Sequence, residues 1–300
     1  MTDSKITVAL ISAAVSVVTV LLSFLLKTWF EKNFVVFKLE AEHRYDQKKK
    51  IKEIIAKNKT SLLDAAESLN HRFWNFSVNY EKGWHTTKDF SDLSRHYYLA
   101  SFAYRILSFF AWVRRIETQM VFLDATVASS ADINFIKFLR ILNHVMCDTI
   151  LFNGLDYNDF YATDHFFKND FNHMCECFWK DESVLSYADF KNNLGECLAQ
   201  AKPMLAMLSG VGPREDRLRW DRLQALHYLL LMFLNAYGYD FQYTSSKKIK
   251  ILISRSPRPN KTVSNLRDML GEISLARHKE VKKILKALCN VMQPIRYTRG

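Results

Sequence analysis

The chain has 300 residues, of which 49% are hydrophobic and 24% charged, and it contains only 8 Gly and 5 Pro. This composition excludes a disordered protein and disfavours an all-β fold, which needs many turns. The net charge is +11, and the five cysteines are an odd, scattered set that is typical of reduced thiols in the cytoplasm. We therefore expect an all-α protein with one large or two small domains.

The run from Ile6 to Leu26 contains no Asp, Glu, Lys, Arg or His. As a helix it would extend roughly 30 Å, which is the thickness of the hydrocarbon core of a bilayer. A cleaved signal peptide would have a shorter apolar core of about 7–15 residues followed by a small-x-small cleavage site. A buried core helix of this length would usually carry a polar face. Both alternatives stay open, and a retained single transmembrane helix is favoured.

Basic residues are distributed unequally around this run. Only Lys5 precedes it, whereas ten Lys and Arg residues lie between 27 and 59. Because positively charged segments are retained in the cytoplasm, we expect a single-pass protein of the inner (plasma) membrane. Its amino terminus would be outside the cell and its body in the cytoplasm.

Small or hydroxyl-bearing side chains recur along one face of the predicted span. Small residues allow close approach of two helices, and hydroxyl groups can form hydrogen bonds across the interface. The pattern predicts a self-association seam, or a narrow polar pore lining in a homo-oligomer; the alternative is that the hydroxyl groups bond only to their own backbone. At spacings of 3, 4, 3 and 4, the seam consists of Ala9, Ser12, Ser16, Thr19 and Ser23.

The remaining chain has mostly helical periodicity. No Gly or Pro occurs between Met1 and Lys82, so a nearly continuous helix, or two helices in line, is expected there. The only strand-like piece is 248–254. Further helices are expected from about 89 or 91 to 124, 129–154, 164–179, 184–208, 214–239, 262–272 and 274–292. The predicted parts are a transmembrane anchor at 1–29, a juxtamembrane helical stalk at 30–82, a cytosolic helical body at 83–240 and a basic helical segment at 241–300.

One pair of residues matches a catalytic motif. Arg222 and His227 fit R-x4-H, the ribonuclease signature of the HEPN superfamily of small helical bundles. The resemblance implies metal-independent RNA cleavage, with Arg222 and His227 as the catalytic residues. Leu223 departs from that family, in which a polar residue usually follows the Arg. Because His227 also shares a helix face with Leu223, Leu230 and Leu234, a buried, hydrogen-bonded histidine is the favoured interpretation.

The sequence contains little other evidence for a catalytic or metal site. There is no Gly-rich phosphate loop, G-x-S-x-G elbow or H-E-x-x-H motif. Cys175 and Cys177 form a lone C-x-C near His165 and His173, and zinc sites normally pair such a motif with a second one. We therefore expect no metal site and no cofactor, and an enzyme is less favoured than a non-enzyme.

The carboxyl-terminal segment carries the excess positive charge. Residues 241–300 contain 14 Lys and Arg against three acidic residues. Such a segment can contact anionic lipid, nucleic acid or an acidic protein partner. The residues expected to make contact with anionic lipid or nucleic acid are Lys247, Lys248, Lys250, Arg255 and Arg258.

The layout of one amino-terminal span, a helical cytosolic body and one R-x4-H resembles the membrane accessory proteins of type VI-B RNA-targeting CRISPR systems. That resemblance implies a HEPN-like, oligomeric, pore-like protein of bacterial anti-phage defence that permeabilises or depolarises the inner membrane. Its partners would be itself, the lipid bilayer, and RNA or a cytosolic defence-complex protein. The alternatives are a membrane-tethered HEPN-type ribonuclease and a non-catalytic scaffold for a cytosolic partner.

Overall fold

A computed structural model describes residues 3–90, 93–157, 164–192, 194–253 and 259–292. In this part of the chain the fold is all-α, as expected. The strands are a single short antiparallel hairpin, in which β1 (Trp179–Lys180) pairs with β2 (Ser183–Val184). The chain divides into two compact units, Met1–Lys52 with Leu123–Ala128, and Glu53–Phe122 with Ser129–Gly300. The part boundaries expected at 29, 82 and 240 stay predictions.

Helix α1 (Asp3–Asn79) is continuous over 77 residues and contributes to both units. Its continuity confirms the expectation drawn from the absence of Gly and Pro. It is followed by a 3-10 turn, Tyr80–Lys82, and then by Gly83, whose backbone N–H donates to the carbonyl of Tyr80. The φ of Gly83 is +66°, a left-handed conformation that glycine adopts without a Cβ penalty, so the chain turns here.

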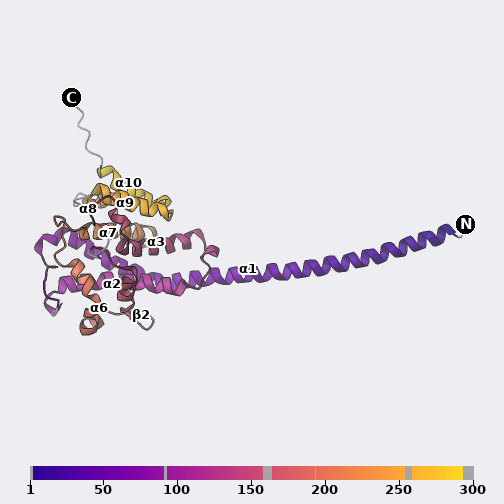
Figure 1. The fold of residues 1–300 in the computed structure, drawn as a ribbon, viewed down its shortest axis with the longest axis horizontal. Helices are drawn as coiled ribbons and strands as arrows, with labels where there is room; N and C mark the ends of the chain where they lie inside the picture. The colour runs from indigo at the N-terminus through magenta and orange to yellow at the C-terminus, as the bar shows by residue number, and fades with distance from the viewer. Residues whose placement is uncertain (1–2, 91–92, 158–163, 193, 254–258, 293–300) are drawn as a thin grey trace, which may run out of the picture. The chain divides into compact units, whose positions relative to one another are not determined.

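The second unit is built around α7 (Arg219–Tyr237), which is buried from Arg219 to Leu234 on all of its faces. A helix with no exposed side belongs in the middle of a domain. Helices α3, α9 and α10 pack against α7, and α8 packs against α10 (Figure 1). Helix α2 packs against α3, α4, α5 and α6. The bounds of these helices are α2 (Tyr97–Met120), α3 (Ser130–Cys147), α4 (Lys168–Glu176), α5 (Tyr187–Asn192), α6 (Leu194–Leu208), α8 (Ser246–Ile253), α9 (Pro259–Glu272) and α10 (Lys279–Met292).

Two expected elements differ from the structure in type or continuity, and the helix expected from 89 or 91 begins only at Tyr97, after a 3-10 turn (Leu93–Arg95). The strand expected at 248–254 is wrong, because Ser246–Ile253 forms helix α8, with Ile249, Leu252 and Ile253 buried on one side. A short apolar run fits both periodicities, and packing against α10 selects the helical one. The single helix expected at 184–208 is divided into β2, α5 and α6.

The start of α3 was correctly predicted. The Ser129 side chain accepts a hydrogen bond from the backbone N–H of Asp132, and the Asp132 carboxylate accepts one from the backbone N–H of Ser129. This reciprocal pair is a capping box, which satisfies two backbone donors at the helix start. The helix ends at Cys147, earlier than expected, and a 3-10 turn (Ile150–Phe152) follows.

Candidate functional site

The apolar run of α1 is the first candidate site. Among the described residues, α1 is the one helix long and apolar enough to cross a membrane, and none of its apolar window is buried. Large side chains such as Val8, Leu10 and Phe24 are 66–67% exposed. A core helix of a soluble protein passes the same length and composition test, although such a helix is mostly buried. Insertion of α1 into a membrane therefore stays a prediction.

The predicted seam lies on the exposed surface of α1. The Ser16 hydroxyl donates to the Ser12 carbonyl at 2.9 Å, and the Thr19 hydroxyl donates to the Val15 carbonyl at 2.7 Å. These are the local backbone bonds that the sequence left open as an alternative. Each hydroxyl oxygen still has acceptor capacity, so the local bonds are compatible with a contact across an interface.

Arg222 is fully buried in α7. Its Nε donates to the Asp164 carbonyl, its Nη1 to the Val145 carbonyl, and its Nη2 to the Asp148 carbonyl at 3.1 Å. Its Cζ lies 4.4 Å from the centre of the Phe152 ring. Burial lowers the pKa of Arg222 to about 10, so the side chain stays charged at neutral pH. In this position Arg222 ties the chain that follows α3 to the central helix.

His227 is also buried, on a different side of α7. Its Nε2 lies 3.0 Å from Asn70 Oδ1, and its ring stacks on Phe73 at 4.9 Å between ring centres. Burial lowers the pKa of His227 to about 3, so the ring is neutral at pH 7. Positions five apart on a helix lie about 140° apart around its axis. The geometry gives Arg222 and His227 separate packing roles, and catalysis by the pair stays a prediction.

The pKa of His227 makes stability depend on pH. Between the ordinary pKa of 6.5 and the folded pKa of about 3, the unfolded chain binds a proton that the folded chain does not. Folding should therefore lose about 1.4 kcal/mol for each unit that the pH falls in this window. In His227→Gln, which can still donate to Asn70, this loss should be absent. Thermal midpoints of the native protein and of His227→Gln, measured from pH 7 to pH 4.5, test this. The prediction is contradicted if the two midpoints fall equally as the pH is lowered.

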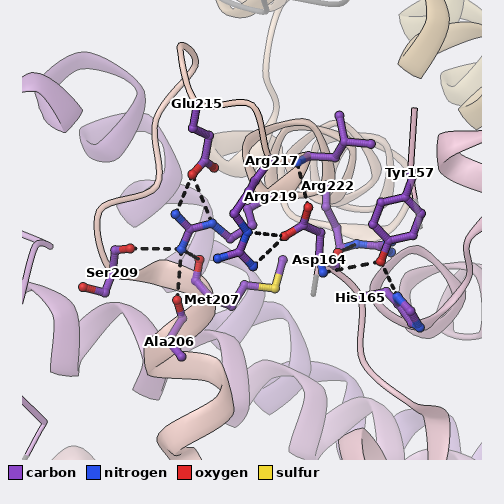
Figure 2. A network of polar contacts seen from close by, with 11 residues as sticks. Tyr157, Asp164, His165, Ala206, Met207, Ser209, Glu215, Arg217, Arg219 and Arg222 are labelled. Carbon is purple, nitrogen blue, oxygen red and sulfur yellow. Dashed lines mark hydrogen bonds and ion pairs between the residues drawn. The ribbon is translucent and has the colours of Figure 1, made fainter. Parts of the chain in front are cut away.

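Figure 2 shows a polar network that holds the start of α7. Asp164 is 3% exposed and accepts hydrogen bonds from Arg217 Nε at 2.7 Å and from the Leu218 backbone N–H at 2.9 Å. Arg219 pairs with Glu215 and donates through Nη1 to three carbonyls at 3.0–3.1 Å, those of Ala206, Met207 and Ser209. Because the guanidinium groups bind backbone carbonyls as well as carboxylates, the network fixes loops and the end of α6 rather than offering an open reactive centre.

A cavity of about 560 Å³ lies beside this network. Its size is that of a small-molecule site. Arg217, which lines it, is paired with Asp164, so the charge that it presents is already compensated. No motif in the sequence indicated this cavity. Its lining includes His165, Phe167, Asp170, His173, Pro203 and Arg217.

The cysteine and histidine residues in and directly after α4 do not gather into a larger cluster. Cys177 Sγ lies 3.9 Å from His173 Nε2. Across the described ranges, no group of three or more His, Cys, Asp or Glu residues could hold a metal ion. All five cysteines are free thiols, and burial raises the pKa of Cys147 to about 12 and that of Cys175 well above its ordinary value. Cys147 and Cys175 are therefore protonated and unreactive at neutral pH.

The expected basic contact residues are only partly placed. Lys247, Lys248 and Lys250 are exposed on α8, and Lys248 Nζ lies 5.0 Å from the centre of the Trp74 ring. Arg255 and Arg258 lie outside the described residues. Contact of this segment with anionic lipid or nucleic acid stays a prediction.

No protein-family model, curated protein or solved structure matches this chain. Over the described residues, the class that the fold and the candidate site define is an all-α protein with one exposed helix that is long and apolar enough to cross a membrane.

Proposed function

We propose that the chain is a single-span inner-membrane protein that self-associates through the seam of α1 and permeabilises the membrane in bacterial defence. Its amino terminus is outside and its helical body is in the cytoplasm. The observation that carries the proposal is the exposed apolar run of α1. The defence role rests on the resemblance in layout described above.

The exposed side chains support insertion on energetic grounds. Burying a large aliphatic or aromatic side chain is worth about 1.5–3 kcal/mol relative to leaving it in water. From Ile6 to Leu26 the helix exposes thirteen Val, Ile, Leu and Phe side chains. A contiguous apolar surface of this extent on a soluble protein marks an interaction with a membrane or a partner. The length of the run matches the hydrocarbon core.

The seam continues beyond the predicted span on the same helix face. At 100° per residue, Ser12, Ser16, Thr19 and Ser23 fall within about 60° of one another around the axis, together with Phe30, Phe34, Phe37 and Ala41. The three Phe side chains are 57–69% exposed. One face of α1 therefore presents small side chains inside the predicted membrane segment and aromatic side chains beyond it.

A groove of about 520 Å³ lies on this aromatic stretch, lined by Phe34, Phe37, Lys38, Ala41, Glu42, Tyr45 and Asp46. Residues at i, i+3, i+4 and i+7 form the hole that receives a side chain from a facing helix in a coiled coil. Phe34, Phe37, Lys38 and Ala41 have this spacing, with the small Ala41 beside two large rings. The face thus provides both aromatic side chains that can act as knobs and a hole that can receive such a side chain. This supports pairing with a second copy of the chain.

Substitutions in the seam test the proposal. Replacing Ser12, Ser16 and Ser23 together by Leu should prevent close approach of the helices while keeping the span apolar. We expect the mass of the detergent-solubilised particle to fall toward that of a monomer. Ion efflux from lipid vesicles containing the protein should fall with it.

The matched control places Leu at Ala14, Val17 and Val18, on the opposite side of α1, and should keep both the mass and the efflux. A monomeric native particle, or efflux that is unchanged by the seam substitutions, would contradict the proposal. A passive scaffold would insert normally and show no efflux in any variant. The ribonuclease alternative is not favoured, since Arg222 and His227 are buried and have separate partners.

A further inference from the structure

Two arginines cross between α1 and α2 in a reciprocal arrangement. Arg72 Nη2 donates to Ser101 Oγ at 2.7 Å, and Arg105 Nε donates to Ser68 Oγ at 3.0 Å. Ser68 precedes Arg72 by four residues on α1, and Ser101 precedes Arg105 by four residues on α2. Each arginine therefore binds the serine that lies one turn before the other arginine on the facing helix, and the charge of Arg72 is felt at Arg105.

Neither guanidinium group has an acidic partner in the described part of the chain. Arg72 is only 7% exposed, and its buried Nε has no hydrogen-bond partner there. Among the described residues, Ser68 is the hydrogen-bond partner of the Arg105 side chain. Burial and the charge of Arg72 both lower the pKa of Arg105. This contrasts with Arg114, Arg217 and Arg219, which pair with carboxylates.

Two carboxylates on the neighbouring segments, Glu67 beside Ser68 and Asp189 two residues after Tyr187, are bound to other groups. Glu67 lies 3.5 Å from His71 and accepts a hydrogen bond from Gln242 at 2.7 Å. Asp189 pairs with Lys180 at 3.1 Å. Two adjacent like charges in a partly buried site cost free energy unless a counter-charge is present. Since the described chain supplies no such counter-charge, an anion from outside would offset the cost.

Aromatic side chains flank the two arginines. Arg72 Cζ lies 4.2 Å from the centre of the Tyr98 ring, which is 5.6 Å from the Trp84 ring. Tyr97 contacts the Tyr187 ring edge-to-face at 5.9 Å. Tyr97 is 58% exposed and lies close enough to Arg105 to influence its pKa. Trp84 is 48% exposed, and the Lys82 ammonium lies 4.6 Å from the centre of its ring. Exposed aromatic rings beside arginines suit a ligand that combines a phosphate with a flat base.

We propose that Arg72 and Arg105, with Tyr97 and Trp84, form a binding site for a nucleoside phosphate, either free or at a single-stranded RNA. The guanidinium groups bind the phosphate oxygens, and the base stacks on an exposed ring. The site goes beyond the proposed membrane function, because it lies within the second unit and does not depend on insertion of the span.

Thermal stabilisation of the full-length protein in detergent tests the anion site. A ligand that binds the folded state raises the thermal midpoint. Inorganic phosphate and ATP should each raise the midpoint of the native protein and of Arg140→Gln, which removes an exposed arginine on α3. They should not raise the midpoint of Arg105→Gln. In buffer without phosphate, Arg105→Gln should be no less stable than the native protein, because one of two like charges has been removed.

Affinity measurements identify the ligand. ATP and a ten-nucleotide fluorescent single-stranded RNA are titrated into the same proteins. We expect Arg105→Gln to weaken the tighter of the two by about 10–100-fold, the loss typical of hydrogen bonds to a charged group. Tyr97→Ala should weaken the same ligand but leave stabilisation by inorganic phosphate unchanged. Tighter binding of ATP indicates a free nucleotide, and tighter binding of the RNA indicates a strand.

Three results would overturn the proposal. The first is no binding of ATP or RNA. The second is an equal loss of affinity in Arg105→Gln and Arg140→Gln, because binding would then reflect the overall positive charge. The third is stabilisation by inorganic phosphate with no dependence of ATP or RNA affinity on Tyr97 or on Trp84→Ala, since the site would then take a simple anion.

Discussion

An Arg222→Ala variant is expected to lose about 3–5 kcal/mol of folding free energy, since each of three buried backbone carbonyls loses its donor at a cost of about 1 kcal/mol or more. The side chain is fully buried and donates to three backbone carbonyls. Its removal leaves those carbonyls without a donor and opens a void beside Phe152. For a body of this size the thermal midpoint should fall by about 6–20 °C. Tryptophan fluorescence during heating measures this shift.

The control is Arg140→Ala, at an exposed position on α3, where a change within about 0.5 kcal/mol is expected. If Arg222→Ala shifted the midpoint no more than this control, the packing role assigned to Arg222 would be wrong. The comparison also bears on the ribonuclease alternative. Loss of RNA cleavage in an Arg222 variant would report unfolding unless the variant kept its thermal midpoint.

Replacing Val15, Val17 and Val18 together by Arg should release the chain from the membrane. Each Arg near the centre of a transmembrane helix costs about 2.5–3.5 kcal/mol, whereas each Val, Ile, Leu or Phe contributes only about 0.3–0.6 kcal/mol in favour of insertion. The thirteen such residues between Ile6 and Leu26 together contribute about 4–8 kcal/mol. The three Arg residues cost about 7.5–10.5 kcal/mol, which exceeds the contribution of about 3–6 kcal/mol from the ten remaining apolar residues. The fraction of protein kept in membranes after an alkaline carbonate wash measures the change.

The matched variant replaces the same three residues by Ala, which keeps the helix uncharged and should keep it in the membrane. A normal thermal midpoint of the released triple-Arg protein would show that its body is folded. The membrane prediction fails if the native protein is washed off, or if the triple-Arg protein is retained.

Local features of the fold could be predicted because their signals lie within a few residues. The absence of Gly and Pro before Lys82 predicted the continuous helix, and the helix start expected at 129 is confirmed by the cap that Ser129 and Asp132 form. The run at 248–254 was assigned wrongly because its apolar residues satisfy both a strand and one side of a short helix. Packing against α10 decides between them, and a single sequence does not contain that information.

The polar sites are built from residues that are far apart in the chain. Asp164 is 53 residues from Arg217, and Arg105 is 37 residues from Ser68. No motif spacing links such residues, so neither the Asp164 network nor the arginine pair could be predicted. The burial of His227 was the favoured interpretation, because its position beside Leu223, Leu230 and Leu234 could be derived from helical periodicity alone.

The contact between Asn70 and His227 joins residues that are 157 positions apart. At a synthesis rate of about 5–20 residues per second, His227 is made about 8–30 s after Asn70. The central helix of the body is thus added long after Ile6–Leu26 has left the ribosome. If the apolar run directs the nascent chain to the membrane, that step would precede completion of the core. The body would then fold while α1 is already at the membrane.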